Sequence, residues 1–101
     1  MRVPAHFDAE SFGTIMRLLR LGNIAEFEAV LGLSQIVRLP AERVPIAGML
    51  GEAYALRTRF SSNDTFYAIL ARRSSALLVT CDERLARAAE GFANVRFIKL
   101  R

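Results

Sequence analysis

A short apolar run, Ala76–Cys81 (ALLVTC), is followed at once by a helix-forming segment, and this succession strongly constrains the fold. Continuous apolar runs of this length are typical of parallel strands that are buried on both faces. The next segment, which begins with Asp82 and continues ERLARAAE, has the composition of a helix. The stretch therefore predicts a strand-to-helix unit of an α/β fold, with Asp82 at the junction.

Asp64 begins the predicted helix that precedes this strand, over Asp64–Arg72. The segment carries apolar side chains around almost its whole circumference, which is typical of a buried helix. We therefore expect Asp64 to lie near the interior or in a cleft. Asp82 is expected in the crevice at the carboxyl end of the strand, where open α/β sheets bind ligands. Two carboxylates in these positions indicate a metal site.

The remaining segments alternate between helix and strand, which is a pattern of α/β proteins rather than of all-α domains. Gly22 is expected to end the first helix as a C′ glycine. Asn23 and Glu26 have the spacing of a capping box for the second helix. The predicted elements are a helix over Phe7–Leu21, a helix from Asn23 to about Gly32, a strand over Ile36–Leu39, a helix from Pro45 to about Arg57, and a strand over Val95–Leu100. We predict one domain over residues 1–101, with an open parallel sheet and helices on both faces.

Composition limits the classes of protein to which this chain can belong. With 101 residues, of which 52% are hydrophobic, it can bury the core of one small domain. No apolar run approaches the roughly 18 residues of a membrane-spanning helix, so we expect no membrane insertion. The N-terminal segment MRVPAHFDAE lacks the apolar core of a secretory signal. Cys81 is the single cysteine, which excludes an intrachain disulfide and fits a cytoplasmic protein.

The net charge of +4 is carried almost entirely by arginine, with thirteen arginines and one lysine. Arginine stays charged at every relevant pH and forms forked contacts with phosphate groups. Two interpretations stay open: a solvated surface, or a rim that guides a nucleic-acid backbone towards the carboxylates. The arginines recur as close pairs, namely Arg17 with Arg20, Arg57 with Arg59, Arg72 with Arg73, and Arg84 with Arg87.

Glu10 is a third acid near the start of a predicted helix, the one that begins at Phe7. Alone, each of Glu10, Asp64 and Asp82 is explained by helix capping or by a favourable charge at a helix N-terminus. Their recurrence where the loops of an α/β fold converge favours a shared site. Hard oxygen ligands of this kind suit Mg²⁺ or Mn²⁺. His6 is the only histidine, and we interpret it as an incidental loop residue.

Three stretches around these acids resemble motifs of PIN-domain ribonucleases, and within that superfamily of VapC-type toxins from bacterial toxin–antitoxin pairs. They are VPAHFDAE with Glu10, SSNDTFYAILA with Asp64, and LLVTCDERLA with Asp82. The resemblance covers essentially the whole chain, with the motifs in the family's order and spacing. It implies that Glu10, Asp64 and Asp82 bind Mg²⁺ or Mn²⁺ and hydrolyse RNA, leaving a 3′-hydroxyl. It also implies that the hydroxyl of Thr80 supports Asp82.

The resemblance implies partners as well. Toxins of this kind act on RNA, and three arginines are candidate contacts to its backbone: Arg17, Arg57 and Arg84. Toxins of this family usually form homodimers. A VapB-like antitoxin silences them by laying a peptide segment across the active-site groove. Three apolar residues of the first helix either line such a groove or pack in the core: Met16, Leu18 and Leu19.

One departure from the family is that its opening strand–helix unit, with one of its acids, is absent before Met1. The absent strand is central in the family's sheet, between the strand that ends near Val3 and the strand over Ala76–Cys81. We therefore expect an N-terminally truncated sheet with unpaired edges, which strand exchange in a homodimer would complete. The chain is interpreted as a fragment of a toxin, as an inactive remnant, or as a domain completed by another chain.

Two alternatives to an active ribonuclease stay open from the sequence. The first is a non-catalytic, degenerate PIN module that binds an antitoxin peptide or RNA through its arginines. The second is a small α/β domain whose acids serve only as helix caps. The spatial relation of the three acids distinguishes these alternatives from a metal-dependent enzyme.

Overall fold

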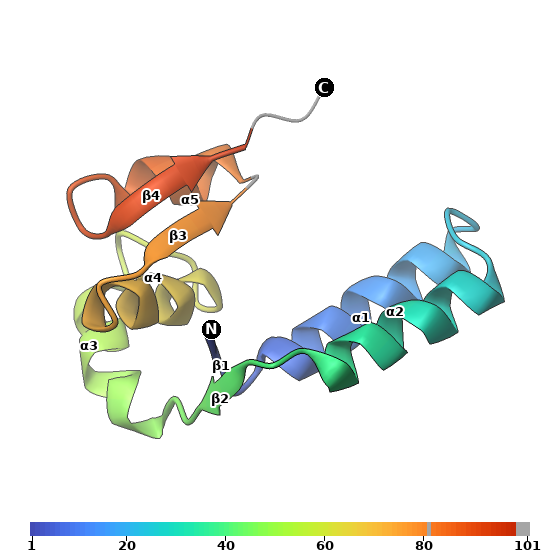
Figure 1. Cartoon of the computed structure of the whole chain (residues 1–101). Helices are drawn as coiled ribbons and strands as arrows, with labels where there is room; N and C mark the ends of the chain where they lie inside the picture. Colours follow the sequence, from blue (N-terminus) through green and yellow to red (C-terminus); the bar gives the residue numbers. More distant parts are fainter. Residues whose placement is uncertain (81, 99–101) are drawn as a thin grey trace. The chain divides into compact units, whose positions relative to one another are not determined.

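The structure of the chain is a computed structural model that describes residues 1–80 and 82–98 (Figure 1). Three residues that the sequence assigns to strands lie outside these ranges, namely Cys81, Lys99 and Leu100. Within them, every helix is too short or too polar to cross a lipid bilayer.

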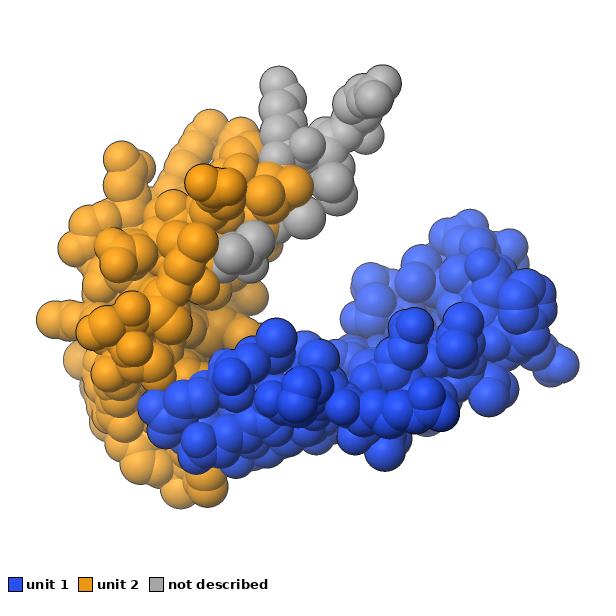
Figure 2. Space-filling view, in the orientation of Figure 1, with its two compact units in different colours: residues 1–44 blue, residues 45–101 orange. Residues whose placement is uncertain are grey.

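Two compact units make up the chain, Met1–Val44 and Pro45–Arg101 (Figure 2). The elements of the first unit are β1 (Arg2–Pro4), α1 (Phe7–Arg20), α2 (Glu26–Arg38) and β2 (Glu42–Val44). The two strands pair in parallel, with Val3 opposite Arg43. The two helices lie side by side as a hairpin (Figure 1). The organisation of both units as one domain over residues 1–101 stays a prediction.

Helix α1 agrees with its predicted extent, whereas α2 runs further than the sequence indicates. Gly22 follows α1 with a φ of +75°, in the left-handed region that favours glycine, and ends the helix as predicted. The predictions of a helix end near Gly32 and of a strand over Ile36–Leu39 are wrong, because α2 continues to Arg38. Gly32 allows close helix packing instead, since a Cβ there would lie only 3.3 Å from Cδ1 of Ile15 in α1.

The start of α2 is displaced from the predicted capping box. The N-cap residue is Ala25 rather than Asn23, and its N–H donates a hydrogen bond to Oε1 of Glu28 at 2.8 Å. A glutamate three residues after the N-cap makes the same contact in a capping box. Alanine has no side-chain acceptor to return the bond, so only half of the motif forms.

Arg43 of β2 connects three elements of the first unit through its guanidinium. Its Nη2 lies 2.9 Å from Oδ1 of Asp8 in α1 and 2.9 Å from the carbonyl oxygen of Ile36 in α2. Its Nη1 donates to the carbonyl oxygens of Leu39 and Ala41, at 3.1 and 3.0 Å. The hydrogen bond with Asp8 raises the pKa of Arg43 above its ordinary value. The guanidinium therefore stays charged and donates to three carbonyl groups at and after the end of α2.

Replacing Arg43 with alanine is expected to lower the midpoint of thermal unfolding, because the Asp8 carboxylate and the carbonyls after α2 lose a common donor. Arg43→Lys should recover only part of the loss, since an ammonium group lacks the planar fork. Melting curves followed by circular dichroism measure both effects. Arg2→Ala is the matched control, because Arg2 pairs at the surface with Glu42 at 3.5 Å. A shift no larger than that of the control would contradict the assigned role.

The second unit alternates helices and strands. Its elements are the 3₁₀ helix η1 (Ala47–Met49), α3 (Leu50–Ala55), α4 (Asp64–Arg73), β3 (Leu77–Thr80), α5 (Glu83–Ala89) and β4 (Asn94–Phe97). β3 and β4 pair in parallel, with Leu78 opposite Val95. The predicted strand–helix–strand order after Ala76 is therefore confirmed.

The strands of the chain pair two by two, β1 with β2 and β3 with β4. Their parallel pairing agrees with the predicted α/β class. The described strands form one two-stranded sheet in each unit, and a single open sheet stays a prediction. The resemblance assigns the absent central strand to a position between β1 and β3, and the truncation itself stays a prediction.

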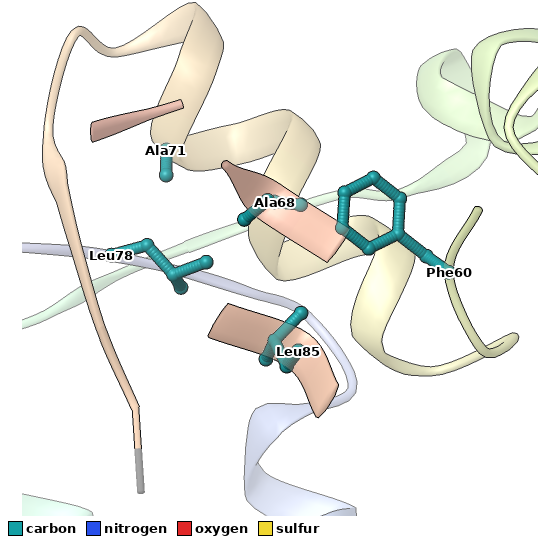
Figure 3. Packing of buried hydrophobic residues seen from close by; sticks show 6 residues of the cluster. Phe60, Ala68, Ala71, Leu78 and Leu85 are labelled. Carbon is teal, nitrogen blue, oxygen red and sulfur yellow. The ribbon is translucent and has the colours of Figure 1, made fainter. Parts of the chain in front are cut away.

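The core of the second unit lies where α4, β3 and α5 meet. The side chains of Ala68, Leu78 and Leu85 face a common interior, with Phe60 at its edge (Figure 3). Phe60 also packs edge-to-face on Phe92, with 5.3 Å between the ring centroids. The buried residues of this cluster are Phe60, Ala68, Ala71, Leu78, Leu85 and Ala89.

Strand β3 is buried at Leu78 but not at Leu77, which corrects the prediction of a strand buried on both faces. Leu78 is 9% exposed, whereas Leu77, whose side chain points to the opposite face, is 53% exposed. Both α4 and α5 contribute to the cluster on the Leu78 face, so these two helices do not divide between the two faces of the sheet. Helix α4 is buried as predicted, through Thr65, Ala68, Ile69, Leu70 and Ala71.

Candidate functional site

Asp82 is the N-cap residue of α5. Its Oδ1 accepts hydrogen bonds from the backbone N–H groups of Arg84 at 2.9 Å and Leu85 at 3.3 Å. The capping explanation for Asp82 is therefore confirmed. Both bonds end on Oδ1, so Oδ2 accepts none within the described part of the chain. One carboxylate oxygen fixes the helix, and the other is available to a ligand.

Thr80 is the last residue of β3 and contacts Asp82 directly. Its Oγ1 accepts a hydrogen bond from the backbone N–H of Asp82 at 3.0 Å. The bond goes to the backbone of Asp82 and not to its carboxylate, so it fixes the turn from β3 into α5. A role for Thr80 in the chemistry of the site stays a prediction.

Asp64 is the first residue of α4. The N-cap residue before it, Asn63, makes no side-chain capping bond. The N–H of Asp64 donates to Oγ of Ser61 at 3.4 Å. The half-buried carboxylate of Asp64 accepts no hydrogen bond from the described residues, so an N-cap contact does not account for it.

Asp64 and Asp82 line the same pocket, which has a volume of about 310 Å³. Phe60 and Leu85 belong both to the core cluster and to the wall of this pocket, so the pocket is built on the packed interior (Figure 3). The complete lining is Arg59, Phe60, Ser61, Asp64, Asp82, Arg84, Leu85 and Ala88. The fold of the second unit thus brings together two acids that are far apart in the sequence.

Arg59 lines this acidic pocket, although in the sequence it stands out only as one member of an arginine pair. Its Nε and Nη2 donate to the carbonyl oxygens of Ala88 and Glu90, the latter at 2.6 Å. These carbonyls lie at the C-terminal end of α5, where cations are favourable. The guanidinium carbon also lies 5.3 Å from the ring centroid of Phe92. The contacts hold Arg59 in place and were not detectable from the spacing of arginines.

The arginines predicted to contact RNA fall in different places. Arg84 lines the acidic pocket with Arg59, and Arg57 lines an adjacent pocket. Arg17 is exposed in the last turn of α1, in the first unit. Guanidinium groups beside carboxylates suit a phosphodiester that binds next to a cation.

Glu10 belongs to α1, in the first unit. Its Oε1 lies 3.3 Å from Nε2 of His6, one turn earlier. His6 occupies the N-cap position of α1, and its ring contacts the carboxylate of Glu10, a structural contact beyond the incidental role inferred from the sequence. Because Glu10 and the acidic pocket belong to different units, its approach to Asp64 and Asp82 stays a prediction.

The donor set of the acidic pocket fits Mg²⁺ or Mn²⁺. Such ions are often held by one or two carboxylates, with water and substrate phosphate completing the coordination. The Asp64 carboxylate and Oδ2 of Asp82 are the two oxygen donors of this pocket that could bind such an ion. Over residues 1–80 and 82–98, no three His, Cys, Asp or Glu side chains form a group that could hold a metal ion. A cation here would therefore depend on ligands beyond these two acids.

Comparisons with known proteins identify relatives of the chain. It is 34% identical over 88 residues to Ribonuclease VapC3 of Mycobacterium tuberculosis, and the match covers 87% of this chain but only 64% of that protein. It is 31% identical over 98 residues to Ribonuclease VapC12 of the same species, covering 97% of this chain and 76% of that protein. No protein-family model matches the chain, and no solved structure matches it. At this identity and coverage, the chain belongs to the family of the VapC ribonucleases.

Proposed function

We propose that this chain acts as a divalent-metal-dependent endoribonuclease of the VapC type. The pocket shared by Asp64 and Asp82 supports the proposal, because it provides oxygen ligands in a chain of this family. Arg59 and Arg84 in the same pocket supply positive charge for an RNA phosphate. The proposed substrate is RNA, and the proposed place of action is the cytoplasm.

In the proposed reaction, Asp64 and Asp82 would hold Mg²⁺ or Mn²⁺ through oxygens that accept no hydrogen bond from the described residues. A bound cation would supply Lewis-acid chemistry, which favours deprotonation of water and offsets charge on the scissile phosphate. The water oxygen forms a bond to phosphorus while the bond to the 3′ oxygen breaks and that oxygen takes up a proton. The capping bonds to Oδ1 of Asp82 fix the direction of Oδ2 before substrate arrives.

We also propose two protein partners, a VapB-like antitoxin peptide and a second copy of the chain. The helical hairpin of the first unit supports a protein partner, since large apolar side chains stand exposed on it. Phe27 is 73% exposed and Val37 is 81% exposed. On α1, Met16, Leu18 and Leu19 are only half-buried. Strand exchange between copies is a proposed route to the dimer.

Cleavage of end-labelled RNA tests the proposed activity. We expect cleavage with Mg²⁺ or Mn²⁺, none with EDTA, and recovery when the metal is returned. Asp64→Asn should lose activity, because an amide is a poor substitute for a carboxylate as a ligand of Mg²⁺. Glu83→Gln is the matched control, because Glu83 neighbours Asp82 in sequence but does not line the acidic pocket. Cleavage that persists in EDTA and in Asp64→Asn would refute the metal mechanism.

A second candidate function is a non-catalytic module that binds RNA or an antitoxin peptide. It is favoured by one observation, that the described residues supply no third acid to the acidic pocket. This candidate predicts RNA binding that weakens with salt, without cleavage in either metal. The same labelled RNA, followed by gel shift and by cleavage, distinguishes the two candidates.

A further inference from the structure

A second pocket adjoins the acidic one, and it has a volume of about 280 Å³. Phe60 and Ser61 belong to the walls of both pockets. Asp64 lines the acidic pocket, while the next residue, Thr65, lines the second. The lining of the second pocket is Leu50, Ala53, Tyr54, Arg57, Phe60, Ser61, Ser62, Thr65 and Phe66. A ligand that spans the shared wall would therefore occupy both pockets.

Tyr54 and Arg57 present a stacked pair in this second pocket. Tyr54 is 67% exposed, and the guanidinium carbon of Arg57 lies 4.1 Å from the centroid of the Tyr54 ring. Nη1 of Arg57 donates to the carbonyl oxygen of Tyr54 at 3.0 Å, which holds the guanidinium over the ring. Aromatic rings and guanidinium planes are the surfaces on which unpaired bases of single-stranded RNA stack.

The wall of the second pocket also contains an unsatisfied polar group. Thr65 is 3% exposed, and its hydroxyl has no hydrogen-bond partner among residues 1–80 and 82–98. A buried hydroxyl without a partner is less stable than a bonded one. Base edges carry both donors and acceptors, which are the groups such a hydroxyl needs. The lining of the second pocket includes one cationic side chain, Arg57, and no carboxylate. Because this charge repels cations and attracts phosphate, the pocket favours a neutral base attached to a phosphate over a cationic ligand.

We propose that the pocket of Tyr54, Arg57 and Thr65 binds one unpaired nucleobase of the RNA, next to the phosphate at the acidic pocket. This inference rests on the proposed function and assigns to it a subsite for one base beside the phosphate. The wall shared through Phe60 and Ser61 puts the base and the phosphate in neighbouring positions. Stacking selects a base without requiring a particular sequence.

Fluorescence anisotropy of the full chain in EDTA tests this inference. The probes are a labelled short oligouridine and an abasic RNA of the same length, which keeps the phosphates and lacks the bases. Tyr54→Ala should weaken binding of oligouridine by about tenfold, within the range for loss of one stacked base. It should leave binding of the abasic RNA unchanged. Tyr54→Phe, which keeps the ring, should retain the affinity of the original chain.

Arg57→Lys tests the guanidinium plane separately from its charge. It should weaken binding of oligouridine and leave the salt dependence of binding unchanged, because the charge is kept. Phe97→Ala is the matched control, since Phe97 carries an exposed ring on β4 and lines neither of the two pockets, so its loss should have no effect on binding of either RNA. Circular dichroism establishes whether each variant is folded. If Tyr54→Ala is unfolded, Arg57→Lys is compared with Tyr54→Phe and with the original chain instead.

Three results would overturn the inference: unchanged binding of oligouridine in Tyr54→Ala, equal losses of binding for both RNAs, or a similar loss in Phe97→Ala. The test is independent of cleavage because metal is absent. Ring-dependent binding of bases without Mg²⁺-dependent cleavage would refute the proposed function and support the inference. Cleavage with unchanged RNA affinity in Tyr54→Ala would refute the inference alone.

Discussion

Asp82→Asn is expected to lower the rate of Mg²⁺-dependent RNA cleavage by about a hundredfold or more, while the midpoint of thermal unfolding hardly changes. The asparagine carbonyl can accept the N–H groups of Arg84 and Leu85, and asparagine caps helices about as well as aspartate. The substitution removes the negative charge that would hold the cation at Oδ2. Losing one group that stabilises the transition state commonly costs a factor of about 10²–10³ in rate.

Asp82→Ala separates the two roles of this residue. It removes the metal ligand and the cap together, so it should lose activity and also about 1 kcal/mol of stability. Cleavage rates and melting curves of the two variants, measured side by side, provide the comparison. Full activity in Asp82→Asn would refute the catalytic role. A melting midpoint of Asp82→Asn as low as that of Asp82→Ala would show that the charge itself stabilises α5.

Leu78→Ala is expected to lower the free energy of unfolding by about 2–5 kcal/mol, as is usual for truncating a buried leucine. Leu78 is 9% exposed and belongs to the cluster to which α4 and α5 contribute. Leu77→Ala is an unusually close control, because Leu77 is the neighbouring residue of β3 and is 53% exposed. That substitution should cost about 0.5 kcal/mol or less. Denaturant unfolding curves measure both values.

The consequence of Leu78→Ala should extend to the acidic pocket. Phe60 and Leu85 belong to the same cluster and line that pocket, so a cavity at Leu78 loosens its wall. We expect Leu78→Ala to reduce RNA cleavage even where the variant is still folded, whereas Leu77→Ala should keep it. Equal losses of stability in the two variants would contradict burial of β3 on one face.

Local signals in the sequence were sufficient where one short segment decides its own conformation. Gly22 ends α1 because a left-handed residue favours glycine, and α4 is buried as its apolar circumference predicts. Asp82 caps α5 because a short acceptor side chain can reach the free N–H groups of the first turn. Each of these outcomes depends on a few consecutive residues.

Predictions failed where distant packing decided the conformation. Gly32 reads as a helix stop, yet the side chain of Ile15 lies against it and α2 continues to Arg38. The sequence pattern assigns no role to Arg43, which connects Asp8 with a carbonyl near the end of α2. Burial of β3 on one face depends on which elements cover it, and an apolar run carries no information about that.

By itself, the sequence determined the parallel α/β character of this protein and its family, and it singled out Asp64 and Asp82 as candidate site residues. These properties follow from local pattern and from motifs in fixed order. Only the tertiary structure decided that the two acids share one pocket, that Arg59 joins them, and that Tyr54 and Arg57 line the adjacent pocket. The physical reason is that pockets arise where segments distant in the chain pack together, and no single segment encodes its neighbours.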